Sequence, residues 1–358
     1  MSNRNKPNYF TVKDLKPLIK NIDYLFLIGE RANGKSYSVK SHCLNEAYKS
    51  IQDGKCEKQI AYIRRYDIDC KDSLCEPYFS DMPISEITNN RYTMVSVYRK
   101  KIYFANINED TGKVQREVCI GYCFAVSNGE HYKSLMYPYI TNIIYEEVIS
   151  ERAQYLYSEP NKFQQLISTI LRDRKGKVFL IGNTLSRMCP YYNEFGLKGV
   201  EALGLGEGNI YTIDNTRIRV YRCKSRNYNS GMFFGMASKN ITKGEYLTEQ
   251  YPHLPRKFND YRVIYTCVLK YETFMYMMYF LKGDDTYTWY VTPKTTPIQE
   301  KTRVISTEYN SDLLWTNGFL ALNDSEQKIF NILLKQKRVV FSDNLTGTEF
   351  NNVLKYFK

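Results

Sequence analysis

Short apolar runs alternate with longer segments of helical periodicity through the first half of the chain. Residues 22–28 are almost continuously apolar, which is typical of a strand buried on both faces of a sheet. The same reasoning predicts further strands at 59–64, 141–145 and 177–182, and helices at 36–50 and 161–172. Because strands and helices alternate, we predict an α/β fold with a central, mostly parallel sheet.

Residues 92–126 show a second pattern, in which strand-like runs follow one another without helices between them. These runs lie at 92–98, 101–107 and 117–126. The segment 108–113, Asn-Glu-Asp-Thr-Gly-Lys, is a strong turn signal. We therefore predict a β insertion at the edge of the sheet. The polar segment 66–74 is predicted to be a loop.

The pattern changes near residue 200, where glycines cluster at positions 199, 204, 206 and 208. We predict a first domain over 1–200 and a linker module over 201–245. The linker module carries a basic run made of Arg217, Arg219, Arg222, Lys224 and Arg226.

Residues 246–358 are predicted to form a second domain. Its first part contains three strand-like runs, at 261–270, 273–280 and 286–291. Two helices are predicted to close the chain, at 325–337 and 348–357. Consecutive strands followed by helices indicate a small α+β domain.

Composition narrows the class of protein. The chain has 358 residues, of which 43% are hydrophobic, so intrinsic disorder is excluded and two domains are expected. No apolar run reaches the roughly 18 residues that span a bilayer, so we expect no membrane partner. The net charge of +12 hints at a polyanionic partner, although many basic proteins never bind nucleic acid.

Residues 29–36 fit the phosphate-loop pattern G-x-x-x-x-G-K-[ST] at every position, and they follow a predicted strand and open a predicted helix. The glycines let the main chain wrap a phosphate, and the helix adds its positive N-terminal end. Lys35 is expected to reach the β- and γ-phosphates of ATP, and the Ser36 hydroxyl to ligate Mg²⁺. The predicted nucleotide-binding residues are Gly29, Glu30, Arg31, Ala32, Asn33, Gly34, Lys35 and Ser36.

Two acidic residues, Glu146 and Glu147, end the strand predicted at 141–145. We expect Glu146 to hold the Mg²⁺ shell and Glu147 to orient or deprotonate the attacking water. The alternative is a solvated strand terminus. A water-activating Glu beside a metal acid suggests an ATPase of the additional-strand type, and a GTPase is excluded because the base-reading N-K-x-D motif is missing.

Two further residues are candidates for catalysis. Asn183 follows the strand at 177–182, where such ATPases sense the γ-phosphate; the alternative is a capping residue at a turn. The segment 172–175, Arg-Asp-Arg-Lys, precedes the same strand. An arginine there can stabilise transition-state charge on the ATP of a neighbouring subunit, or it can belong to a solvated basic loop.

These motifs together resemble the DNA-packaging motor ATPases of small tailed phages, the φ29-type packaging ATPases related to terminase large subunits. The resemblance rests on the phosphate loop with Tyr37 after it, on Tyr62-Ile63-Arg64-Arg65-Tyr66, and on Asn183 followed by Pro190-Tyr191-Tyr192. It covers the whole chain and is strongest over residues 20–200. One departure is Glu146, where the family usually has Asp.

The resemblance implies a homo-oligomeric ring, a pentamer in that family, at the portal of a procapsid. It implies ATP-driven pumping of double-stranded DNA and, in that family, a partner that is the portal or a structural RNA. The protein is then expected in the host cytoplasm at the portal vertex, and not in the mature virion. By the match of motifs, Arg172 is the trans-acting arginine finger and Lys133 a second trans-acting basic residue, while Arg64 and Arg65 match the family's arginine pair.

The resemblance also implies that the second domain is a vestigial RNase H-like domain. A two-metal nuclease needs clustered carboxylates, and the opening strand Val-Ile-Tyr-Thr-Cys-Val at 263–268 carries none, so we expect no nuclease activity. Candidate DNA contacts are Arg99, Lys100 and Lys101 beside the β insertion, and the basic run from Arg217 to Arg226. Such residues should touch phosphates rather than bases; for each set a solvated basic face is equally compatible.

The function that we predict is ATP-driven translocation of double-stranded viral DNA into a procapsid. A helicase-like ATPase is one alternative. The other is a nucleic-acid-binding assembly factor that binds ATP as a switch without turnover.

Overall fold

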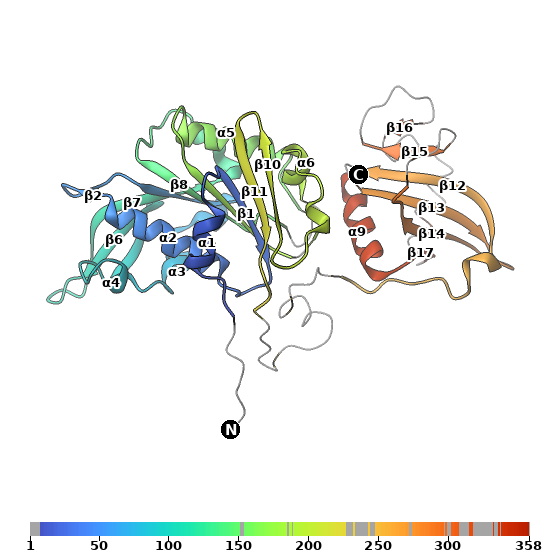
Figure 1. Cartoon of the computed structure of the whole chain (residues 1–358), viewed down its shortest axis with the longest axis horizontal. Helices are drawn as coiled ribbons and strands as arrows, with labels where there is room; N and C mark the ends of the chain where they lie inside the picture. Colours follow the sequence, from blue (N-terminus) through green and yellow to red (C-terminus); the bar gives the residue numbers. More distant parts are fainter. Residues whose placement is uncertain are drawn as a thin grey trace. The chain divides into compact units, whose positions relative to one another are not determined.

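The computed structural model describes residues 8–150, 154–184, 186–187, 189–226, 232, 243, 248–271, 274–296, 298, 302–307, 315–317, 332, 336 and 338–357 (Figure 1). The chain divides into two compact units, Met1–Tyr246 and Leu247–Lys358. No helix within the described ranges is long and apolar enough to cross a membrane.

A nine-stranded sheet forms the centre of the first unit. In spatial order its strands are β10 (Gly208–Ile213), β11 (Thr216–Arg222), β1 (Tyr24–Gly29), β9 (Lys177–Asn183), β8 (Ile140–Glu146), β4 (Gln59–Arg64), β7 (Val114–Ala125), β6 (Lys101–Ile107) and β5 (Met94–Tyr98). The strands from β11 to β7 run parallel, whereas β10, β6 and β5 pair antiparallel at the two edges. The predicted mixed α/β fold with a mostly parallel sheet is confirmed.

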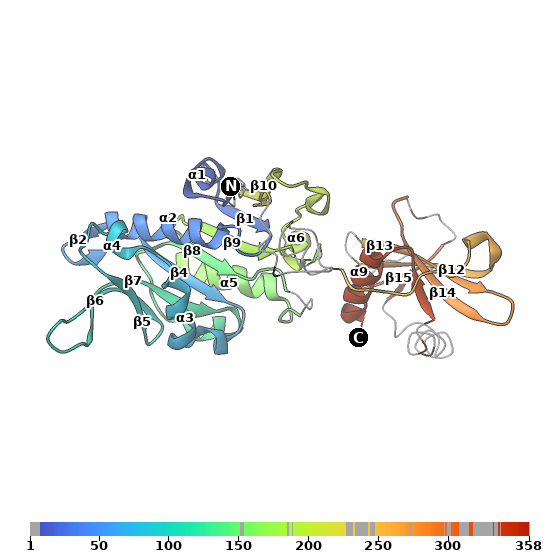
Figure 2. The ribbon, with the colours of Figure 1, turned by 90° about the horizontal axis from the view of Figure 1, so that it is seen from below.

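Helices cover both faces of this sheet, as Figure 2 shows for α2 and α5. Successive residues of β1 explain why: Leu25 and Leu27 pack with Leu44 of α2, while Phe26 and Ile28 pack with Leu166 of α5. The helices of this unit are α1 (Val12–Leu18), α2 (Lys35–Lys49), α3 (Asp72–Phe79), α4 (Ile84–Ile87), α5 (Glu159–Leu171) and α6 (Pro190–Glu194). A separate short hairpin pairs β2 (Ile51–Gln52) with β3 (Lys55–Cys56).

Two predictions about this unit need correction. The segment 66–74 is not all loop, because a 3₁₀ turn at Asp67–Cys70 leads into α3. The linker module over 201–245 is also wrong for residues 208–222, since β10 and β11 extend the main sheet beside β1. The reason is that Ile218 and Val220, between the arginines of β11, are buried in the core. The first unit therefore continues well beyond residue 200.

The second unit contains a six-stranded sheet with one described helix, α9 (Asn344–Leu354), beside it. In spatial order its strands are β16 (Trp315–Asn317), β15 (Arg303–Ser306), β12 (Arg262–Tyr271), β13 (Phe274–Lys282), β14 (Tyr287–Pro293) and β17 (Val339–Phe341). The first three strands along the chain form an antiparallel meander, and the others add in parallel pairings. Phe350 of α9 packs against Tyr276 and Phe341. The helix predicted at 325–337 lies almost entirely outside the described residues.

Candidate functional site

The carboxyl ends of three neighbouring parallel strands bring the predicted site residues together. Gly29 at the end of β1 pairs in register with Asn183 at the end of β9. Glu146 at the end of β8 pairs with Ile181 of β9. Because β9 lies between β1 and β8, Asn183 is placed between the phosphate loop and the two acids. Ligands commonly bind at this edge of parallel sheets.

The loop from β1 to α2 has the backbone that its sequence requires. Gly34, the residue before α2, has a φ of 96°, and a side chain there would collide with the carbonyl oxygen of Phe10. Ala32 also has a positive φ, of 54°, which is uncommon for a residue with a side chain. The loop thus depends on glycine at the position where the helix begins.

Lys35 is buried within this loop, and in the part of the chain that the structure describes its amine has only oxygen atoms of uncharged groups as hydrogen-bond partners. The amine donates to the carbonyl oxygens of Gly29 (3.2 Å) and Glu30 (2.6 Å). It also donates to the amide oxygens of Asn33 (3.2 Å) and Asn183 (3.3 Å). Burial lowers the pKa of Lys35, while Cys223, Glu146 and Glu30 act in the opposite direction. Such a cation is stabilised further by an anion that enters its surroundings.

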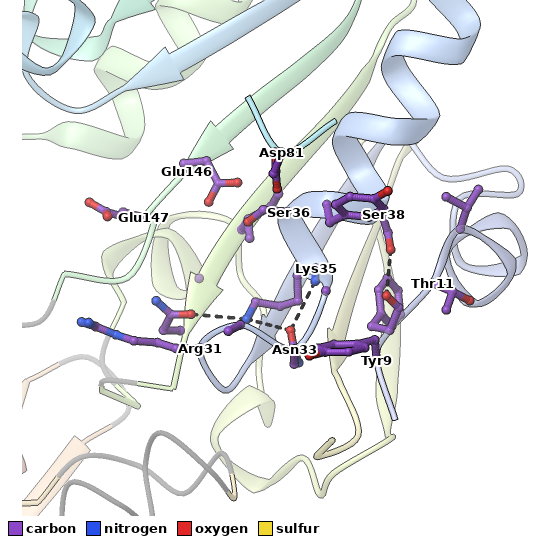
Figure 3. A pocket seen from close by; sticks show the side chains of 18 of the residues that line it. Tyr9, Thr11, Arg31, Asn33, Lys35, Ser36, Ser38, Asp81, Glu146 and Glu147 are labelled. Carbon is purple, nitrogen blue, oxygen red and sulfur yellow. Dashed lines mark hydrogen bonds between the residues drawn. The ribbon is translucent and has the colours of Figure 1, made fainter. Parts of the chain in front are cut away.

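A cavity of about 970 Å³ opens beside Lys35 (Figure 3). Its lining includes Arg31 to Ser38 of the loop and of α2, together with Glu146, Glu147 and Asn183. Arg31, Asn33, Lys35, Ser36, Glu146, Glu147 and Asn183 were all expected at a nucleotide site, and the fold gathers them around one space of a size suited to a nucleotide.

Glu146 is the buried member of the acidic pair, with 8% of its surface exposed. The hydroxyl of Tyr78 donates to its carboxylate at 2.7 Å. Burial raises the pKa of Glu146, although the hydroxyls of Ser36 and Tyr78 and the charge of Lys35 oppose this shift. The Ser36 hydroxyl and the Glu146 carboxylate supply oxygen ligands of the kind that Mg²⁺ prefers, so these two residues fit a shared magnesium shell.

Glu147 is the exposed member of the pair, and 62% of its side chain is accessible. Its φ of 60° turns the chain at the end of β8. The Arg64 guanidinium donates to the Glu147 carboxylate at 2.9 Å. Because Arg64 ends β4, the arginine pair singled out in the sequence lies next to the predicted catalytic acid.

Some residues of the pocket were missed by the sequence reasoning. Residues 9–13, before and at the start of α1, form one wall of the cavity. Phe10 holds this wall in place, because its N–H donates to the Asn33 carbonyl (2.7 Å) and its carbonyl accepts from the Ser38 hydroxyl (2.9 Å). Asp81 lines the cavity and pairs with Lys40. No local motif marks these residues, since only the folded chain brings them to the loop.

The side chain of Glu30 is buried and does not line the cavity, so only its main chain is available for the nucleotide binding predicted at this loop. Its carboxylate accepts hydrogen bonds from the Ser225 hydroxyl (3.0 Å) and from the main-chain N–H of Arg226 (2.6 Å). Burial raises the pKa of Glu30, against these hydrogen bonds. Only the main chain of Glu30 belongs to the phosphate loop.

Arg172 and Lys133 are not among the residues that line the cavity. Arg172 follows α5 with a φ of 51°, and its guanidinium donates to the carbonyl oxygen of Leu135 at 3.3 Å. Lys133 forms an ion pair with Glu130 at 2.7 Å. The two predicted trans-acting residues are therefore brought to one region of the first unit through the segment 133–135.

The candidate DNA contacts form the tight turn between β5 and β6. The main-chain N–H groups of Arg99 and Lys100 donate to the Asp72 carboxylate, at 2.7 and 2.9 Å. The amine of Lys100 pairs with Asp67 at 2.5 Å, so its charge is already balanced within the unit. In the basic run of β11, the Arg219 and Arg222 guanidiniums donate to main-chain carbonyls. Both arrangements stabilise the fold locally.

Comparison with known proteins identifies the family to which the chain belongs. The family of podovirus DNA encapsidation proteins (Gp16) matches residues 5–202, which is more than half of the chain. The chain belongs to this family. The predicted resemblance to phage DNA-packaging proteins is thereby confirmed.

Curated proteins that are similar in sequence to this chain include DNA packaging proteins of Bacillus phages. That of phage B103 is 29% identical over 180 residues, which cover 48% of this chain and 47% of the relative. That of phage phi29 is 26% identical over 175 residues, or 48% of this chain and 46% of the relative. The matches thus span about half the length of these relatives.

Two solved structures share the fold over nearly the whole chain. The bacteriophage Phi-29 viral genome packaging motor assembly matches with a TM-score of 0.59 and 17% identity, over 98% of this chain and 100% of that chain. The Phi-28 gp11 DNA packaging motor matches with a TM-score of 0.51 and 17% identity, over 97% and 98%. At this identity the likeness concerns the fold alone.

Proposed function

We propose that this protein hydrolyses ATP to move double-stranded viral DNA into a procapsid. The observation that carries the proposal is the convergence of Lys35, Glu146 and Asn183 on one cavity at the ends of three adjacent strands; Lys35 opens the helix after the phosphate loop that follows β1. Membership of the DNA encapsidation family supports DNA as the substrate that is moved.

The phosphate loop, the two acids and Asn183 each have a role in this proposal. The loop N–H groups and Lys35 bind the ATP phosphates, and Asn183 senses the γ-phosphate. Ser36 and Glu146 would hold Mg²⁺, which supplies charge neutralisation of the phosphates when bound. Glu147, released from Arg64, orients the attacking water and accepts its proton.

The strand order favours an ATPase of the additional-strand type. In this type one strand separates the phosphate-loop strand from the strand that carries the acids, as β9 separates β1 from β8. A strand in that place puts a polar residue within reach of both the loop and the acids. The Lys35–Asn183 hydrogen bond is one such contact.

We further propose that the protein works as a homo-oligomeric ring, a pentamer by resemblance. Arg172 and Lys133 do not line the cavity of their own subunit, which suits residues that reach the ATP of a neighbour. Mixing Arg172→Ala with Glu147→Gln subunits should then restore part of the turnover that each variant lacks. Absence of restoration in mixtures shown to co-assemble would contradict an arginine finger that acts between subunits.

For the second unit we propose an RNase H-like, vestigial nuclease fold that docks on DNA, on the portal or on a packaging RNA. The antiparallel meander β12–β13–β14, extended by parallel β15 and β16, supports this assignment. We propose no nuclease activity, because β12 carries no carboxylate. Arg99 and Lys101 are the better candidates for DNA phosphates, since Lys100 pairs with Asp67. The site of action is the portal vertex in the host cytoplasm, and the protein is absent from the mature virion.

The test is ATP hydrolysis by the purified protein, with and without double-stranded DNA and cognate procapsids. We expect strong stimulation by both together, with DNA becoming protected from nuclease. Stimulation by any single strand, indifferent to procapsids, would support a helicase instead. Tight ATP binding without turnover in every condition would support the ATP-switched assembly factor. The Glu147→Gln variant is the matched control, because it should bind ATP without turning it over.

A further inference from the structure

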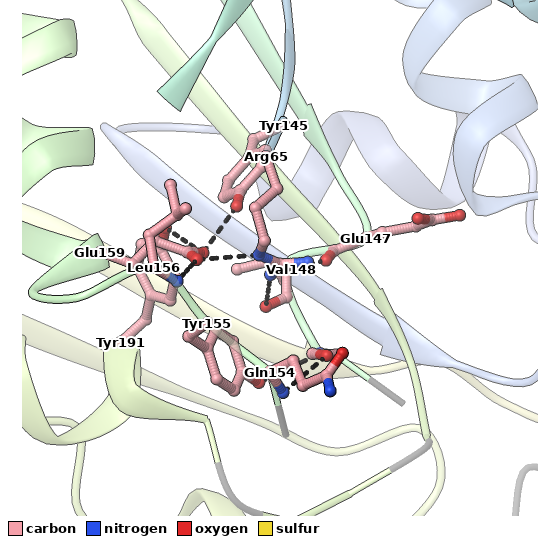
Figure 4. Close-up of polar contacts among 10 residues, drawn as sticks. Arg65, Tyr145, Glu147, Val148, Gln154, Tyr155, Leu156, Glu159 and Tyr191 are labelled. Atoms are coloured by element: carbon pink, nitrogen blue, oxygen red, sulfur yellow. Dashed lines mark hydrogen bonds and ion pairs between the residues drawn. The ribbon is translucent and has the colours of Figure 1, made fainter. Parts of the chain in front are cut away.

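A buried ion pair lies behind the predicted catalytic acid, outside the cavity. The Nε atom of Arg65 donates to Oε2 of Glu159 at 2.8 Å (Figure 4). The residue exposures are 8% for Arg65 and 1% for Glu159. Arg65 directly follows β4, and Glu159 is the first residue of α5, so the pair joins the sheet to the helix that covers it.

The carboxylate of Glu159 has a full set of partners. Its Oε1 atom accepts from the hydroxyls of Tyr145 (2.8 Å) and Tyr191 (3.0 Å). Its Oε2 atom accepts from the N–H of Leu156 (2.8 Å) in addition to Arg65. A carboxylate held from four directions fixes the place of the arginine that pairs with it.

The Arg65 guanidinium also donates hydrogen bonds to the main chain at Glu147 and Val148. Its Nη2 atom donates to the carbonyl oxygens of both Glu147 and Val148, each at 3.1 Å. These peptides follow the residue whose φ of 60° is rarely adopted outside glycine. A conformation of this kind persists when its surroundings hold it, and such residues cluster at active sites.

Arg64 and Arg65 thus hold the same residue in two different ways. Arg64 contacts the Glu147 carboxylate, whereas Arg65 contacts its main chain. The contact of Arg64 occupies one carboxylate oxygen, Oε2, and it must break if that oxygen is the one that acts on water. The contacts of Arg65 are buried and can remain through that change.

We propose that Arg65 and Glu159 are positioning residues that hold the Glu147 main chain in its left-handed conformation and so aim the Glu147 carboxylate at the attacking water. The inference rests on the proposed ATPase function. It assigns a role in the reaction to a buried pair that does not itself line the cavity. A displacement of about 1 Å at a catalytic group can cost on the order of 100-fold in rate.

The main test is the double variant Arg65→Met, Glu159→Gln. It removes both charges together, so no unpaired charge is left buried, and the amide introduced at position 159 keeps an oxygen for Tyr145 and Tyr191. We expect a folded protein whose KM for ATP stays within about threefold of wild type and whose kcat falls at least about tenfold. Turnover is measured with DNA and procapsids present.

The matched control is Arg219→Met. Arg219 also donates to two main-chain carbonyls, those of Pro17 (3.0 Å) and Leu18 (2.9 Å), but it lies on β11. We expect its kcat to equal that of wild type. A wild-type kcat in the folded double variant would overturn the inference, as would an equal loss in the control.

Two further measurements separate positioning from stability. Introducing the double variant into Glu147→Gln should lower the residual turnover no further, because both changes act through one group; independent, multiplicative losses would overturn the inference. Should the double variant fail to fold, Arg65→Lys replaces it. A lysine amine can keep the ion pair but cannot also hold both carbonyls, so kcat should fall with KM unchanged, and wild-type activity would overturn the inference. Absence of turnover in the wild-type protein itself would instead refute the proposed ATPase.

Discussion

Two buried cations on either side of the end of β8 have contrasting surroundings. Arg65 faces a carboxylate that neutralises it, and the network around it is closed. Lys35 faces carbonyl and amide oxygens beside an open cavity, and among the described residues its amine enters no ion pair. A buried charge with its own counter-ion holds the fold together. A buried charge that meets only dipoles is suited to binding an anion from outside.

The largest effect should come from Glu147→Gln, because Glu147 is the residue on which the two regions meet. We expect kcat to fall by about 10²–10⁴-fold, since a positioned base is lost, while ATP binding is retained. Single-turnover hydrolysis and a fluorescence titration with ATP check the two parts. Undiminished hydrolysis would show that Glu147 is not the catalytic base, and the two regions would then not meet at a catalytic residue.

The next effect should be on stability, from Arg65→Met alone. Removing one partner leaves the Glu159 charge buried and unpaired, which costs about 3–5 kcal/mol. Denaturant unfolding should show this loss, and adding Glu159→Gln should recover most of it. Equal instability of the single and double variants would contradict the expectation that Arg65 and Glu159 neutralise each other.

Lys35→Met should affect ATP binding rather than stability. The free energy of unfolding should stay unchanged or rise, because no carboxylate loses its partner. ATP binding should weaken about 10–100-fold, as expected for lost charge-assisted hydrogen bonds. Running the same two measurements on Lys35→Met and Arg65→Met sharpens the contrast. A loss of stability in Lys35→Met as large as in Arg65→Met would contradict it.

The smallest effect concerns pH. Burial raises the pKa of Glu146, so the folded protein binds this proton more tightly than the unfolded chain does. The contribution of Glu146 to stability is therefore present at acidic pH and is lost as the pH rises through its folded pKa. Unfolding at several pH values should show that Glu146→Gln removes this loss. Hydrolysis should conversely weaken on acidification, because a protonated Glu146 cannot hold Mg²⁺.

The parts of the site that could be predicted are those formed by short motifs of consecutive residues. The loop at 29–36, the acids after β8 and Asn183 after β9 each follow a recognisable strand, and parallel pairing brings strand ends together. The wall at 9–13 and the partner of Arg65 could not be found this way. Their positions depend on contacts between residues far apart in the chain, such as the 94 positions that separate Arg65 from Glu159.

The misassigned linker teaches a related lesson about the fold. The glycine cluster and the arginines of 217–226 favour a linker, whereas the alternation of Ile218 and Val220 with polar residues predicts a strand. The structure follows the second signal. Arginines on a strand can be structural, as the Arg219 contacts with Pro17 and Leu18 show. Charge alone therefore does not separate a surface that binds nucleic acid from the side of a sheet.

The inward-facing carboxylate of Glu30 connects the phosphate loop to residues 225 and 226, near the end of the first unit. Glu30 holds the hydroxyl of Ser225 and the main chain of Arg226, just after β11, and the chain then continues to the unit that begins at Leu247. One carboxylate therefore joins the phosphate loop to residues 225 and 226, which lie 195 and 196 positions further along the chain. The loop that is built to surround a phosphate is thus anchored at its second residue by the last described segment of the first unit before residue 227.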